Sequence, residues 1–149
     1  MKKEKLEYIE EFGMMWEKLG ATRISGRILG YLLVCDKEQV SFQELVEVLK
    51  VSKGSVSTNI KALELIGFIQ AVSIAGDRKT YYRAKPVNMP QIFEERLKLI
   101  TVMLNIMEKG QKLKENNNDS ASHFLKEAID FYSWFQKNIP EFFKQYKQR

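Results

Sequence analysis

The fold is decided by one stretch of sequence, residues 41–83, which reads SFQELVEVLKVSKGSVSTNIKALELIGFIQAVSIAGDRKTYYR. Ser41 and Glu44 stand three residues apart at its start. This spacing predicts a capping box, in which the Ser41 hydroxyl accepts from the Glu44 amide and the Glu44 side chain reaches back to the Ser41 amide. The apolar residues that follow recur at helical spacing and predict a short helix over 42–49.

A second helix and a hairpin follow within the same stretch. Ser52 is typical of a helix N-cap and Gly67 of a helix end, so we expect a helix over 53–66. Two β-prone runs then flank a polar turn that contains Gly76, and this pattern predicts a β-hairpin over 68–84. The expected order is therefore a helix, a tight turn, a second helix and a hairpin. This is the order of a helix-turn-helix with a wing, in which the second helix can enter the DNA major groove.

The second helix of the pair has an apolar back and a polar front. At about 100° per residue, Val56, Ile60 and Leu63 fall on one side, and the opposite side carries no acidic residue. Small and basic residues there would allow the backbone to approach DNA, and a helix N-terminus favours phosphate. The residues expected to contact DNA from this helix are Ser52, Lys53, Gly54, Ser55, Ser57, Thr58 and Lys61. Asn59 points closer to the apolar side and is a weaker candidate.

The tip of the hairpin carries two further candidates for DNA contacts. A thin strand pair can place Arg78 in the minor groove, and Lys79 suits a phosphate contact. Residues 50–85 hold seven basic and two acidic side chains, a balance that equals the net charge of the whole chain, +5. Such localised charge indicates a surface that faces phosphates. The alternatives are a solvated face with a chance imbalance and an ordinary surface helix of a bundle.

Further helices are predicted before this stretch. Residues 3–19 show helical apolar spacing that stops at Gly20, and a second helix is expected over 23–34. Gly26 and Gly30 lie within that second helix, where each glycine costs free energy relative to alanine. We therefore expect another element to approach the helix closely at these two positions.

The C-terminal part is predicted to be a pair of helices. Apolar residues form a heptad seam from Phe93 to Met107, and a second apolar stripe runs beside it. Together the two stripes form an apolar face that is wider than a helix of one small domain needs for packing against its own core. A polar loop at 114–120 then precedes a last helix, which we expect to end at Pro140.

The composition excludes several classes of protein. One Cys (Cys35) and one His (His123) form neither an internal disulfide nor a Cys/His zinc site, and they favour a reducing, cytoplasmic location. Cys35 is interpreted as a small buried hydrophobe, with a redox-sensing thiol as the alternative. No apolar run approaches the roughly 20 residues needed to cross a bilayer. The N-terminus is not that of a secretory signal peptide, so no membrane association is expected.

Four parts of the sequence resemble the GbsR subgroup of the MarR-like winged-helix transcriptional regulators. They are GATRISGRILG (20–30), EL with LKVSKGSVS (44–45 and 49–57), NIKALE with GFI (59–64 and 67–69), and GDRK with YY (76–79 and 81–82). The main departure is Ala21-Thr22, where a proline is expected just before the arginine. The resemblance implies a bacterial or archaeal homodimer that binds a near-palindromic operator in double-stranded DNA, usually as a repressor.

The resemblance also implies that the outer helices build the dimer interface. The expected fold class is therefore mainly α (α+β): a winged helix-turn-helix with flanking N- and C-terminal dimerisation helices and a β-hairpin wing. The expected parts are an N-terminal dimerisation helix over 1–20, a DNA-binding domain over 21–86 and a C-terminal helical dimerisation region over 87–149. Some relatives respond to choline-like effectors, which an aromatic cage could bind. Aromatic residues at helical spacing are more often core, so no effector-binding residue is assigned.

Two other functions compete with that of a DNA-binding regulator. A winged helix can serve as a protein–protein docking module without sequence-specific DNA binding, because a fold does not determine a function. The basic front of helix 53–66 argues against that alternative. An enzyme is less well supported, since no nucleophile–base pair, Gly-rich phosphate loop or metal cluster stands out. We therefore expect neither catalysis nor a cofactor.

Overall fold

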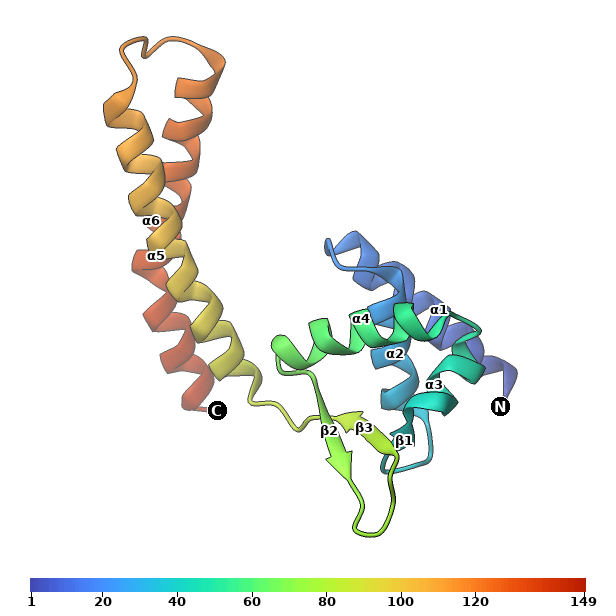
Figure 1. The fold of residues 1–149 in the computed structure, drawn as a ribbon. Helices are drawn as coiled ribbons and strands as arrows, with labels where there is room; N and C mark the ends of the chain where they lie inside the picture. The colour runs from blue at the N-terminus through green and yellow to red at the C-terminus, as the bar shows by residue number, and fades with distance from the viewer. The chain divides into compact units, whose positions relative to one another are not determined.

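The computed structural model describes residues 1–149, and these form two compact units, Met1–Val87 and Asn88–Arg149 (Figure 1). The elements of the first unit are α1 (Lys3–Lys18), α2 (Arg23–Val34), β1 (Val40–Ser41), α3 (Phe42–Leu49), α4 (Lys53–Leu65), β2 (Ile69–Ser73) and β3 (Thr80–Ala84). The second unit consists of α5 (Met89–Leu113) and α6 (Ser120–Lys147). The protein is mainly helical with a small antiparallel sheet, as the sequence predicted.

The sheet has the strand order β1-β3-β2. Strands β2 and β3 form the predicted hairpin, with Ile69 opposite Ala84, and its turn extends away from the helices of this unit (Figure 1). The two-residue strand β1 pairs with β3, with Val40 opposite Tyr82. The sequence did not predict β1, because two residues are too few to show the alternation by which strands are recognised.

Helix α2 is the central element of the first unit and packs against both α1 and α4. A Cβ atom on Gly26 would lie 2.5 Å from the Trp16 Cβ, and one on Gly30 would lie 3.0 Å from the Phe12 Cβ. The close approach predicted at these two glycines is therefore confirmed, and the approaching element is α1. The buried side chains of the core are Ile9, Ile28, Leu29, Tyr31, Leu32, Val40, Leu45, Leu49, Val56, Ile60, Leu63 and Ile69.

The helix caps agree with the sequence except for one half of the capping box. The Ser41 hydroxyl accepts from the Glu44 amide at 3.1 Å. The Glu44 carboxylate does not reach back as predicted. It accepts from the Tyr31 hydroxyl at 2.5 Å and from Lys37 Nζ at 2.9 Å. That half of the prediction is wrong because a phenol and an ammonium group give the carboxylate stronger, charge-assisted hydrogen bonds.

Helices α5 and α6 run antiparallel to each other as a hairpin (Figure 1). The prediction that α6 ends at Pro140 is wrong, because the helix continues through this proline to Lys147. The last turns are held by tertiary contacts that a local pattern does not show. The Phe143 ring packs on Phe93 with centroids 6.3 Å apart, and Lys147 pairs with Glu94 at 3.5 Å. None of the helices combines the length and hydrophobicity required to cross a membrane.

Candidate nucleic-acid interface

One face of α4 is largely exposed to solvent, and we call it the α4 front. Val56, Ile60 and Leu63 are buried on the opposite side and lock α4 into the core. The residues of the α4 front are the seven predicted from the sequence: Ser52, Lys53, Gly54, Thr58 and Lys61 are exposed, and Ser55 and Ser57 are half-buried. The apolar back and the polar front are therefore where the helical spacing predicted them.

The beginning of the α4 front is small and uncharged apart from Lys53. The Ser52 hydroxyl caps the helix by accepting from the Ser55 amide at 3.1 Å, and the first turn contains no acidic residue. A Cβ atom on Gly54 would meet nothing closer than the Ser52 Oγ at 4.0 Å. Packing within the protein therefore does not require a glycine here, although an exposed glycine weakens a helix. The open space in front of Gly54 is available to a bound partner.

Asn59 is not part of this front. Its side chain is 7% exposed, and its amide nitrogen donates to the Ser55 carbonyl at 2.8 Å. Its side-chain carbonyl accepts a hydrogen bond from the Thr22 hydroxyl at the beginning of α2. The expectation that Asn59 points toward the core is confirmed. The carbonyl of Asn59 therefore joins α4 to the beginning of α2, and its amide is used within α4.

The turn of the β2–β3 hairpin, which we call the wing tip, is organised by Asp77. This carboxylate accepts from the Tyr81 hydroxyl at 2.7 Å and from the Lys79 amide at 2.9 Å. The hydrogen bond from Tyr81 is the main reason why the pKa of Asp77 lies below its usual value. Because the acidic group is used inside the turn, the wing tip presents the basic side chains of Arg78 and Lys79 to solvent.

The basic side chains of the two surfaces form no hydrogen bond or ion pair within the protein. Those of Lys53, Lys61, Arg78 and Lys79 are exposed, and Lys79 lies near enough to Asp77 to help lower the pKa of that carboxyl. Arg83 differs, since its guanidinium binds Glu38 at 2.9 Å. Unpaired cations on a helix front and on a neighbouring hairpin of the same unit create an electrostatic surface that is complementary to a polyanion.

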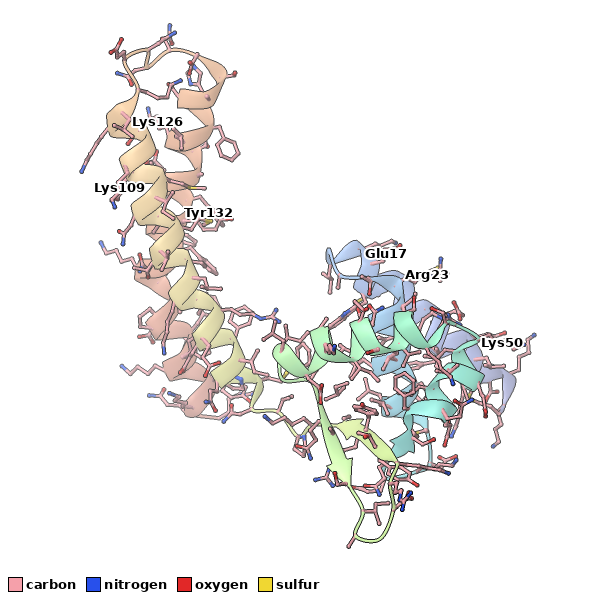
Figure 2. All side chains as sticks on the ribbon, viewed as in Figure 1. Glu17, Arg23, Lys50, Lys109, Lys126 and Tyr132 are labelled. Carbon is pink, nitrogen blue, oxygen red and sulfur yellow. The ribbon has the colours of Figure 1, made fainter.

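Two residues that support this surface were not identified from the sequence. Thr22 binds Asn59, and Arg27 of α2 donates from Nη2 at 3.1 Å to the carbonyl of Leu49, the last residue of α3 before the turn that leads to α4. Neither contact has a local signal, because each joins residues more than twenty positions apart. Lys50, which lies in the same turn, is exposed (Figure 2).

The remaining candidates from the sequence lie outside this surface. Cys35 is half-buried at the end of α2, and its thiol approaches the carbonyl of Lys37 at 3.4 Å. His123 is exposed near the beginning of α6. In the second unit, an apolar groove of about 510 Å³ lies between α5 and α6, and most of its lining is aromatic. Its aromatic residues are Phe93, Phe135, Phe142, Phe143 and Tyr146.

The helix pair with its exposed front and basic wing defines a winged helix-turn-helix protein. No family model matches the chain. It is 33% identical over 144 residues to the HTH-type transcriptional regulator MmpR5 of Mycobacterium tuberculosis, and the match covers 97% of this chain and 87% of that protein. A crystal structure of a transcriptional regulator has 32% sequence identity and a TM-score of 0.74, covering 98% of this chain and 99% of that one. The chain therefore belongs to the MarR-like family of winged-helix transcriptional regulators.

Proposed function

We propose that this regulator is a sequence-specific repressor of the GbsR subgroup that binds a near-palindromic operator as a homodimer. The observation that carries the proposal is the acid-free α4 front, whose basic side chains lack partners within the protein. A solvated helix normally mixes acidic with basic residues. A helix that enters the major groove needs small, polar and basic residues on the side that faces the bases.

The proposed contacts divide into two kinds. Lys53, Lys61 and Lys79 bind phosphates, which contributes affinity that does not depend on sequence. The small residues of the α4 front, above all Thr58, approach base edges in the major groove. Arg78 enters the minor groove from the wing tip, where a basic side chain responds to groove width.

The homodimer is supported by the second unit. Leu104 is the only buried hydrophobic residue of α5 and α6. Large apolar side chains on the same two helices are exposed, namely Met89, Phe93, Leu99, Val102, Ile106, Leu113, Phe124, Phe131, Trp134, Phe142 and Tyr146. Two helices with so much uncovered apolar surface need a further layer, which a second copy of the chain would supply. Two-fold symmetry would then place operator half-sites about 34 Å apart.

A small-molecule effector would release the repressor from DNA. The proposed class is a choline-like compound, in keeping with the GbsR subgroup. The aromatic groove of the second unit supports the idea, because aromatic faces bind quaternary ammonium groups. Thermal unfolding with increasing choline tests this part of the proposal, and a melting temperature that does not rise would contradict it.

Selection of bound duplexes from a random-sequence pool tests the main proposal. The wild-type protein should enrich one near-palindromic sequence, and its affinity for that duplex should fall steeply as the salt concentration rises. Sedimentation equilibrium of the free protein should give the mass of a dimer. If no duplex binds at moderate salt, the protein is instead a docking module for other proteins.

A further inference from the structure

The direction of α4 is set by the turn that joins it to α3, and this turn contains an unusual residue. Lys50 has a φ of 53° and is the one non-glycine residue of the chain in the left-handed region. A side chain with a Cβ adopts that conformation at a cost in free energy. The surrounding structure must therefore hold the turn in place.

The end of α3 provides a place at which the turn can be held. The last carbonyls of a helix lack partners within the helix. No backbone amide of the turn donates to the Leu49 carbonyl. Its donor is Nη2 of Arg27, at 3.1 Å. A guanidinium at this point also interacts favourably with the negative end of the helix dipole.

Arg27 is itself fixed by α1. Its Nε donates to Glu10 Oε1 at 2.7 Å, and its side chain is 20% exposed. The aliphatic part of Arg27 lies against Gly13, where a Cβ atom would be 2.7 Å from the Arg27 Cγ. Helix α1 thus provides the Glu10 carboxylate, and its Gly13 has no side chain that would displace the Arg27 stem. The guanidinium is held between α1 and the end of α3.

We propose that Arg27 is a positioning residue for DNA recognition. It holds the Leu49 carbonyl, keeps Lys50 in its left-handed conformation and so maintains the angle at which α4 meets the bases. The inference rests on the proposed function. Arg27 does not contact DNA in this scheme, because its charge is paired with Glu10. Its loss should therefore weaken discrimination between sequences more than general affinity for DNA.

The variant Arg27→Met tests the role, since it keeps much of the apolar stem and removes every donor. Arg23→Met is the matched control, because Arg23, which is labelled in Figure 2, is on the same helix. It pairs with the same Glu10 at 3.6 Å but does not bind Leu49. Affinities are measured by fluorescence anisotropy for the duplex that the wild type enriches and for a shuffled duplex. The ratio of the two affinities should fall about tenfold in Arg27→Met, the effect of one lost charge-assisted hydrogen bond.

The same ratio should stay within about twofold of wild type in Arg23→Met, as for a surface substitution. Arg27→Lys keeps the charge and should give an intermediate ratio. This variant replaces Arg27→Met if circular dichroism shows that the latter does not fold. An unchanged ratio overturns the proposal. An equal loss on both duplexes also overturns it, since it would make Arg27 a phosphate contact. If the wild type enriches no duplex, the proposed function fails first and the positioning role fails with it.

Discussion

The hydroxyl of Thr22 donates a hydrogen bond to the side-chain carbonyl of Asn59, 37 residues further along the chain. The same oxygen accepts from the Ser25 amide at 3.1 Å and thereby caps α2. Asn59 is buried and donates to the Ser55 carbonyl at 2.8 Å. One threonine therefore joins the beginning of α2 to the middle of α4, and it helps to fix how the α4 front is presented.

Replacing Thr22 with Val should lower the free energy of unfolding by about 1–3 kcal/mol, because the buried Asn59 carbonyl loses its donor and α2 loses its cap. Urea denaturation at one fixed protein concentration measures the change. Thr58→Val is the control, since Thr58 is exposed on the same helix as Asn59. Its effect should stay within about 0.5 kcal/mol. Similar losses in both variants would show that the Thr22–Asn59 bond adds no stability.

Lys53 and Arg78 should affect DNA binding in different ways. Lys53→Ala removes a proposed phosphate contact, so it should weaken binding to all duplexes alike. It should also lower by about one the slope of log affinity against log salt concentration. Arg78→Ala should in addition relax the preference for base composition next to the half-sites. Anisotropy titrations at several salt concentrations measure both effects. Lys126→Ala, an exposed residue of α6, serves as the charge control (Figure 2). Identical behaviour of Arg78→Ala and this control would rule out the wing contact.

Gly54→Ala should raise the stability of the protein while lowering its affinity for DNA. The added methyl group meets nothing closer than the Ser52 Oγ at 4.0 Å and improves helix propensity, so the free energy of unfolding should rise by up to about 1 kcal/mol. Affinity for the selected duplex should fall, because the methyl group occupies the space that DNA would enter. Gly26→Ala gives the contrast, since its methyl would lie 2.5 Å from the Trp16 Cβ and should destabilise the protein. Unchanged DNA affinity in Gly54→Ala would place the contact surface elsewhere.

Tyr81→Phe should raise the pKa of Asp77 toward its ordinary value of 3.8, because the phenol that stabilises the carboxylate is removed. In the wild type the pKa of Asp77 is lower in the folded state than in the unfolded state, so its hydrogen bonds stabilise the wing above pH 3.8. This stabilisation is lost as the pH falls through the folded-state pKa. Carbon-detected NMR titration of the carboxyl group measures the shift. Tyr82→Phe is the control, because Asp77 accepts no hydrogen bond from Tyr82. The same Asp77 pKa in Tyr81→Phe and wild type would disprove this hydrogen bond.

Much of the first unit was predictable from the sequence, because its signals are local. Apolar spacing predicted α2 and α3 at their observed bounds and α4 to within one residue. The hydroxyls of Ser41 and Ser52 each accept a hydrogen bond from an amide three residues further on, so these caps can be recognised from a short sequence pattern. The polar side of α4 follows from the same periodicity, since its apolar side must face the core.

The remaining features depend on where distant segments meet. Helix α6 continues past Pro140 to a turn in which Phe143 packs on Phe93, and β1 is defined by the pairing of Val40 with Tyr82 of β3. In the same way, Arg27 reaches Leu49 only after α1 and α2 have packed together. The hairpin, the composition of the α4 front and the helices apart from the last turns of α6 were predictable from the residues alone, since these features rest on contacts within a few residues. How α4 is anchored becomes visible once the chain is folded, because hydrogen bonds between distant residues leave no periodic pattern in the chain.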